Sequence, residues 1–70
     1  MKNLQRIRKA AGMTQQQLAE AAGLNVRMLQ HYEQGFKDIN GAAALTVYRL
    51  AQARGCQVQD LLELDANEQN

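Results

Sequence analysis

The sequence predicts an all-α fold, a compact domain of five helices, from its composition, its apolar spacing and its glycines. Its 70 residues include no proline, no tryptophan, two tyrosines and one phenylalanine, while Ala, Leu and Gln are the most frequent types. This composition favours helices over strands. Apolar residues recur at helical spacing, and glycines separate the helical segments. A chain of this length forms one domain with a small core.

The first helix is predicted over residues 3–12, where Asn3 can cap the start and Gly12 can end the helix. Its inward positions, at i, i+3, i+4 and i+7, are Leu4, Ile7, Arg8 and Ala11. An arginine on the inward face requires a partner, because a buried unpaired charge is strongly destabilising.

Two short helices joined by a tight turn are predicted over residues 14–34. Thr14 and Gln17 have the spacing of a capping box, and Gly23 can end the first of the two helices in a left-handed conformation. Leu24 is expected to be buried in the turn, and Asn25 can cap the second helix. Their apolar positions are Leu18, Ala19 and Ala22 in the first, and Leu29 and Tyr32 in the second. The remaining faces of the second helix carry Asn25, Val26, Arg27, Gln30, His31 and Gln34.

A fourth helix is expected to begin after Asn40 as its cap and to end at Gly55. One face of it carries Ala44, Val47, Leu50 and Ala51, with Tyr48 beside them. Arg54 is interpreted as a packing residue whose stem lies on apolar surface while its head stays in water. A short fifth helix is predicted over residues 57–64. The domain is expected to cover residues 1–65, and residues 66–70 are expected to form a polar tail.

The formal net charge of +1 conceals an asymmetry along the chain. Residues 1–37 hold six Lys and Arg against two Glu, a net +4, whereas residues 38–70 hold two Arg against five Asp and Glu, a net −3. The positive half contains the paired short helices. Positive charge therefore lies where a phosphate backbone requires it.

Several classes of protein are disfavoured by the sequence. The single cysteine, Cys56, cannot form an internal disulfide and suits a reducing compartment, and no signal peptide or long apolar run is evident. The location expected is therefore the cytoplasm. His31 has no second ligand at metal-binding spacing, so neither a metal nor a cofactor is expected. Catalytic motifs are absent, and we expect a protein that is not an enzyme.

Nine spaced residues resemble the XRE-like helix-turn-helix family, the phage repressor/Cro type. These residues are Gln15, Leu18, Ala19, Gly23, Leu24, Leu29, Tyr32, Glu33 and Gly35. The resemblance implies a five-helix repressor-like DNA-binding domain whose second motif helix enters the major groove. It also implies an ion pair between Arg8 and Glu33, and a Gln15 that contacts a phosphate and buttresses the recognition helix. The connection after Gly35 departs from the family pattern, since it is longer and lacks the usual proline.

The DNA-binding residues expected from this resemblance and from side-chain chemistry are Gln15, Gln16, Asn25, Val26, Arg27, Gln30, His31 and Lys37. Arg27 matches guanine O6 and N7, although a phosphate contact or a solvated role competes with this interpretation. Val26 is a candidate for contact with a thymine methyl group. Met28 is ambiguous between helix packing and DNA. An exposed Gln or Asn outside such a context is most often simply solvated.

The function expected is sequence-specific binding of double-stranded DNA by a transcriptional regulator, repressor-like and acting by operator occupancy. The alternative is a protein-binding module, such as an antitoxin, that keeps the helix-turn-helix as a scaffold and binds a partner through its acidic half. Family members often dimerise through the last helix. The homodimer contacts expected here are Val58, Leu61, Leu62 and Leu64.

Overall fold

A computed structural model of the chain describes residues 1–64, so the expected tail at 66–70 lies outside the described residues. The described part contains helices and no strand, in agreement with the predicted all-α class. The elements are α1 (Asn3–Ala10), α2 (Gln15–Ala22), α3 (Val26–Gln34), the short 3₁₀ helix η1 (Ile39–Gly41), α4 (Ala44–Arg54) and α5 (Val58–Leu61).

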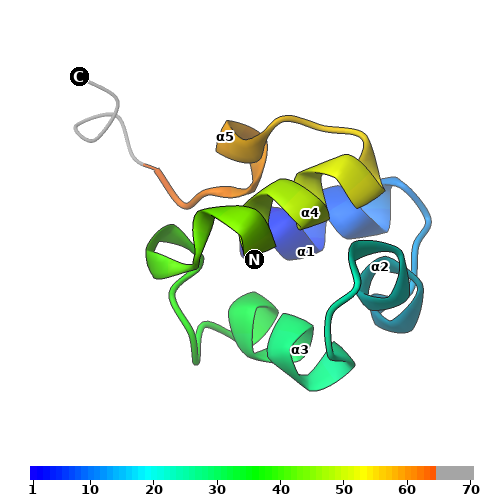
Figure 1. Ribbon diagram of the computed structural model, residues 1–70, viewed down its shortest axis with the longest axis horizontal. Coiled ribbons are helices and arrows are strands. Elements are labelled where there is room, and N and C mark those ends of the chain that lie inside the picture. Colours follow the sequence, from blue (N-terminus) through cyan, green and yellow to red (C-terminus); the bar gives the residue numbers. More distant parts are fainter. Residues whose placement is uncertain (65–70) are drawn as a thin grey trace.

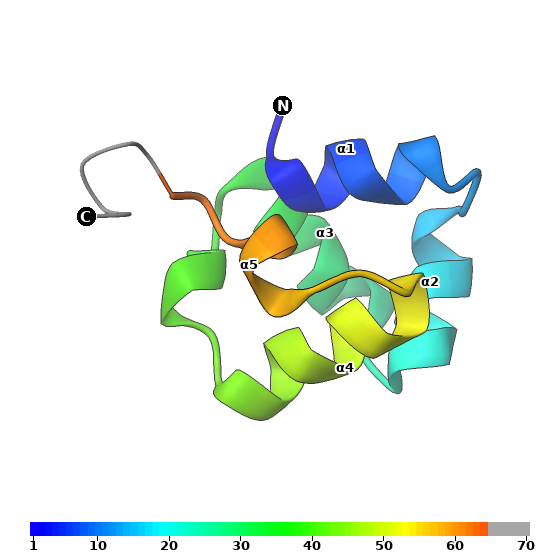
Figure 2. The same ribbon diagram turned by 90° about the horizontal axis from the view of Figure 1, so that it is seen from above.

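The helices surround one small apolar core (Figure 1). Helix α2 packs against both α3 and α4, and α5 lies between α1 and α4 (Figure 2). The buried apolar residues are Leu4, Leu18, Ala19, Ala22, Leu29, Tyr32, Ile39, Val47, Leu50, Ala51 and Leu61. Every helix contributes at least one of them, so the core fixes the position of α3 relative to the rest of the domain.

The helix-turn-helix has the local structure that the sequence predicts. The Thr14 hydroxyl accepts from the Gln17 N–H at 3.0 Å, and Gln17 Oε1 accepts from the Thr14 N–H at 2.9 Å, which completes the capping box. Gly23 ends α2 with φ +70°, and the Asn25 side chain caps α3 by accepting from the Arg27 N–H. Leu24 packs against the core from the turn as predicted, but it is half-buried rather than buried.

Helix α1 is shorter than predicted and has a different cap. It ends at Ala10, and the turn through Gly12 leaves Ala11 exposed rather than inward. Asn3 does not cap it, since Lys2 is the cap residue and its side chain makes no capping hydrogen bond. The Asn3 N–H donates to the Glu63 carboxylate, and the Asn3 side chain donates to the Leu62 carbonyl at 2.8 Å.

The connection before α4 also differs from the prediction. The chain after Gly35 folds into η1, which buries Ile39, and Asp38 rather than Asn40 accepts a capping hydrogen bond there. Asn40 pairs instead with the backbone of Glu63, with both contacts at 2.8 Å. Helix α4 therefore begins at Ala44 without a side-chain cap, and Ala44 is exposed rather than on the inward face.

The last two helices differ from the prediction at three points. Helix α5 covers only Val58–Leu61, and Leu61 is 0% exposed, so this side chain belongs to the core and cannot contribute to a dimer contact. Val58 and Leu62 are half-buried against the core, whereas Leu64 is exposed. The Arg54 head is not simply solvated, because its Nε donates to the Ile7 carbonyl at 3.0 Å and ties α4 to α1.

Candidate nucleic-acid interface

Helix α3 is anchored by one face and presents the other to solvent. Leu29, at 0% exposed, and Tyr32 place the anchored face in the core, and Glu33 is buried beside them. Spacings of three and four residues put these side chains on one side of the helix. The opposite side is therefore held in a fixed orientation by packing rather than by its own contacts.

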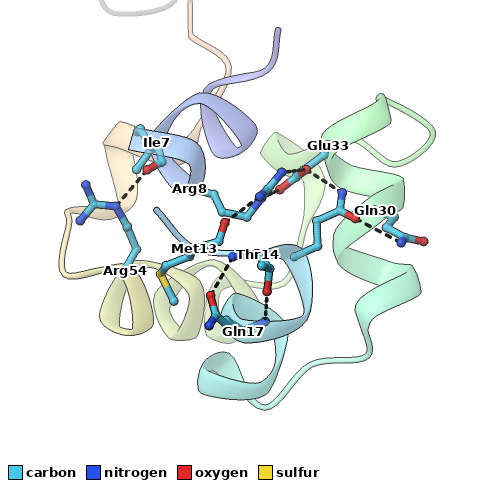
Figure 3. Close-up of polar contacts among 9 residues, drawn as sticks. Ile7, Arg8, Met13, Thr14, Gln17, Gln30, Glu33 and Arg54 are labelled. Atoms are coloured by element: carbon cyan, nitrogen blue, oxygen red, sulfur yellow. Dashed lines mark hydrogen bonds and ion pairs between the residues drawn. The ribbon is translucent and has the colours of Figure 1, made fainter. Parts of the chain in front are cut away.

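The buried charge on this anchored face is paired, as the resemblance implied. Arg8 Nε donates to Glu33 Oε2 at 2.7 Å and Arg8 Nη2 donates to Glu33 Oε1 at 3.0 Å, a two-point contact between α1 and α3 (Figure 3). Arg8 Nη1 donates to the Met13 carbonyl at 2.8 Å. The guanidinium therefore joins α1, the link to α2, and α3 at a single point.

Gln15 extends this polar cluster to the edge of α3. Its Nε2 donates to Glu33 Oε1 at 2.9 Å, and its Oε1 accepts from Gln30 Nε2 at 3.2 Å. Gln15 is half-buried, so it buttresses α3 as the resemblance implied. Sequence reasoning missed its bond to Gln30, because spacing along the chain gives no signal for a contact between residues 15 apart on two helices.

The outer face of α3 carries hydrogen-bonding side chains. Arg27 and Gln34 are exposed, and Val26 is 36% exposed. His31 is half-buried, and its ring meets the exposed Phe36 ring edge-on with centroids 5.9 Å apart. Met28 packs against the core, which assigns this residue to helix packing rather than to the outer face.

The start of α2 lies beside Gln30 and Glu33 of α3, whereas Asn25, which caps α3, follows the end of α2. Gln16 is exposed, with its Nε2 3.3 Å from Glu20 Oε1. The backbone N–H groups of Gln15 and Gln16 have no partner among residues 1–64, as is usual in a first helical turn. Such groups favour a bound anion. Asn25 is exposed, and its Oδ1 is occupied by the Arg27 N–H.

The loop after α3 brings together two lysines that are distant in sequence. Lys37 is exposed, and its N–H donates to the His31 carbonyl at 3.2 Å. The Lys2 stem lies over Gly35. If residue 35 had a Cβ atom, that atom would lie 3.3 Å from Lys2 Cε. Lys2 was not among the DNA-binding residues expected from the sequence, because only the fold brings the N-terminus to the end of α3.

Two further features of the described residues bear on function. Within residues 1–64, no group of three or more His, Cys, Asp and Glu side chains is placed to hold a metal ion. No helix in that part of the chain is long and apolar enough to cross a bilayer.

Comparison with protein families identifies the fold. A helix-turn-helix family model matches residues 4–61, which cover α1 to α5 and therefore both the motif and its scaffold. No curated protein and no solved structure matches the chain. The match to the family model, together with the capped α2–turn–α3 geometry, shows that the chain belongs to the XRE-type helix-turn-helix family of DNA-binding regulators.

Proposed function

We propose that this protein is a sequence-specific DNA-binding transcriptional regulator that acts, like a repressor, by occupying an operator. Helix α3 enters the major groove, and the observation that carries this proposal is the division of α3 into a buried anchoring face and an exposed polar face. A rigid helix with hydrogen-bonding side chains on one side is suited to the donors and acceptors on base edges. DNA as the ligand is consistent with the cytoplasmic location expected from the sequence.

The proposed contacts are of two kinds: contacts to phosphates position the protein on the duplex, and contacts to base edges determine its sequence preference. The free N–H groups at the start of α2, with Gln15 and Gln16, bind one phosphate, and Lys37 binds another. Arg27 reads a guanine, and Val26 contacts a thymine methyl group. His31 and Gln30 lie one turn further along α3 and contact neighbouring base pairs, while Asn25 holds the start of α3 in place.

Binding as a C₂ dimer places one α3 in each of two successive major grooves. With Leu61 in the core, the contact uses Leu64, which is 37% exposed, and the exposed parts of Val58 and Leu62. This surface is small, so the dimer forms mainly on the operator. Analytical ultracentrifugation with a duplex of two half-sites should give two chains per duplex. A strict one-to-one complex would contradict the dimer.

The test of base reading is binding-site selection from a random duplex pool, at fixed salt because affinity depends steeply on salt. Arg27→Ala should cost about 1–3 kcal/mol on the preferred site and relax the base choice at one position in each half-site. Arg49→Ala is the matched control, since it removes the same charge from an exposed position on α4. If Arg27→Ala lowers affinity but keeps every base preference, Arg27 is a phosphate contact.

A second candidate function is the protein-binding module, and one observation favours it. Leu45 and Tyr48 on α4 are 56% and 53% exposed, an apolar pair in the acidic half of the chain. Affinity for DNA that falls steeply with salt supports DNA binding, because phosphate contacts release counterions. Absence of such binding by the intact protein would favour the protein-binding module instead.

A further inference from the structure

A continuous chain of hydrogen bonds leads from the buried ion pair to the DNA-facing side of α3. Glu33 accepts from Arg8 at both oxygens, and its Oε1 also accepts from Gln15 Nε2 at 2.9 Å. Gln15 Oε1 then accepts from Gln30 Nε2 at 3.2 Å (Figure 3). Gln30 is half-buried and lies one turn beyond Val26. The chain therefore ends at a side chain on the proposed recognition surface.

The chemistry of the groups fixes the direction of this chain. The Glu33 carboxylate, held in an ion pair, can only accept hydrogen bonds. Gln15 must therefore turn its NH₂ group toward Glu33, which leaves its carbonyl oxygen on the other side. That oxygen is also only an acceptor, so Gln30 must turn its NH₂ group toward Gln15. Amide orientation is usually an open choice, but each choice here follows from the previous one.

We infer that Glu33, acting through Gln15, orients the Gln30 amide so that its carbonyl oxygen faces DNA and selects adenine. This inference rests on the proposed function. Figure 3 shows Gln30 Oε1 pointing away from the bond with Gln15. Adenine presents an N6 donor and an N7 acceptor side by side in the major groove. Gln30 Oε1 accepts from N6, and the hydrogen of Nε2 that Gln15 does not use donates to N7.

The same orientation disfavours the other bases. Guanine O6 and thymine O4 are acceptors, so they would repel the carbonyl oxygen of Gln30, which is also an acceptor. Cytosine offers only its N4 donor, so it ranks second. A glutamine free to rotate could present its NH₂ group to guanine or thymine equally well. The distinguishing expectation is therefore that base choice at this position depends on Gln15, a residue that does not touch the base.

The first part of the test uses the free protein and needs no DNA. Solvent exchange of the side-chain NH₂ protons, measured by NMR, should be slower for Gln30 than for Gln52, an exposed glutamine on α4. In Gln15→Ala the Gln30 rate should rise to that of Gln52. Equal rates for the two residues in the unmodified protein would overturn the hydrogen-bond chain itself.

The second part is binding-site selection with the unmodified protein, Gln30→Ala, Gln15→Ala and the control Gln52→Ala. Gln30→Ala should lose the preference at one position per half-site, which identifies the base that Gln30 contacts. That base should be adenine. Gln15→Ala should weaken binding overall and admit guanine and thymine at that position while the other preferences persist, and Gln52→Ala should change nothing.

The outcomes separate this inference from the proposed function. If a site is enriched and Gln15→Ala still selects only adenine at the position that Gln30 contacts, the inference alone is overturned. Selection of guanine or thymine at that position by the unmodified protein would also overturn the inference alone. No enriched sequence with the unmodified protein overturns the proposed function and the base preference together. Arg8 pairs with both Glu33 oxygens independently of Gln15, so Gln15→Ala should retain the main anchor for α3.

Discussion

The helix-turn-helix, residues 14–35, and the C-terminal half, residues 36–64, use polar groups in contrasting ways. In the helix-turn-helix both helix starts are capped by residues two or three positions away, through Thr14 with Gln17 and through Asn25. In the C-terminal half the start of α4 has no side-chain cap, and Glu63 is fastened by residues 23 and 60 positions away. The helix starts of the helix-turn-helix are therefore specified locally, whereas the start of α4 and the position of Glu63 depend on the assembled fold.

Glu63 shows what the long-range arrangement does. Its carboxylate accepts from the Asn3 N–H, one of the donors that the first turn of α1 leaves without a helical partner. Its backbone N–H and carbonyl are both bonded to Asn40. Glu63 therefore holds both the start of α1 and the connection before α4 in place. These contacts join residues 60 and 23 positions apart, so each forms only at the entropic cost of closing a long loop.

The largest effect is expected at the contact that holds the helix-turn-helix on α1. Arg8→Met or Glu33→Gln should each reduce the free energy of unfolding by about 3–5 kcal/mol, because a buried charge loses its partner. Urea denaturation of both single variants and the double variant gives the coupling energy.

The matched control for this cycle is Arg49→Met, at an exposed arginine, which should change stability by less than about 0.5 kcal/mol. A coupling energy near zero would mean that the ion pair contributes nothing specific to the position of α3. The helix-turn-helix would then be held by its apolar packing, including Leu29 and Tyr32, and the contrast between the two regions would weaken.

The next effect is expected in the C-terminal half, at the leucine of α5 that packs into the core. Leu61→Ala should cost about 2–5 kcal/mol, because Leu61 is 0% exposed and its loss leaves a cavity in the core. Leu64→Ala, at 37% exposed, should have little effect on the free energy of unfolding. The measurement is denaturation without DNA. Equal costs for the two leucines would show that α5 does not close the core.

A smaller pair of effects compares a distant contact with a local cap directly. Asn40→Ala removes both hydrogen bonds to the Glu63 backbone and should cost about 1–3 kcal/mol. Thr14→Ala removes a local cap and should cost about 1 kcal/mol. Amide hydrogen exchange locates each loss, at Asn3 and Glu63 for the first variant and in the first turn of α2 for the second. If amide exchange became faster throughout the domain in both variants, the two contacts would not act on separate regions.

The contrast between local and distant contacts also explains which features of the fold could be predicted from the sequence alone. The capping box at Thr14, the Asn25 cap and the Gly23 exit from α2 depend on neighbours in sequence, and each was predicted from spacing. The Arg8–Glu33 pair came from the family resemblance. Asn3 and Asn40 have the side chain of a good cap, and that same local signal was misleading, because Leu62 and Glu63 compete for them in the fold.

The candidate site shows the same limit. The exposed face of α3 follows from helical spacing, so Arg27 and Gln34 were predicted to be on it. The bond from Gln30 to Gln15 was not predicted, since it depends on how closely α2 and α3 approach. The place of Lys2 over Gly35 depends likewise on where the N-terminus lies. Sequence therefore identifies the exposed face of α3 but not the contacts that orient its side chains.

The smallest effect concerns Cys56, the free cysteine in the turn between α4 and α5. Burial raises the pKa of the Cys56 thiol, the Asp60 carboxylate adds to the rise, and Arg54 opposes it. The folded pKa thus lies above the unfolded value of about 8.5. The thiol's contribution to stability is complete below that value and is lost as pH rises through the folded pKa. At neutral pH the neutral thiol should therefore react slowly with iodoacetamide.

Cys56 can report local opening of the C-terminal half, because it is the single cysteine of the chain and lies outside the helix-turn-helix. Asn40→Ala releases the segment after α5, so alkylation at fixed pH should accelerate in this variant. Thr14→Ala loosens only the start of α2 and should leave the alkylation rate close to that of the unmodified protein. Equal acceleration in both variants would mean that the two regions open as one cooperative unit. The local cap at Thr14 and the distant contacts of Asn40 would then both stabilise the whole domain, although one joins neighbours in sequence and the other does not.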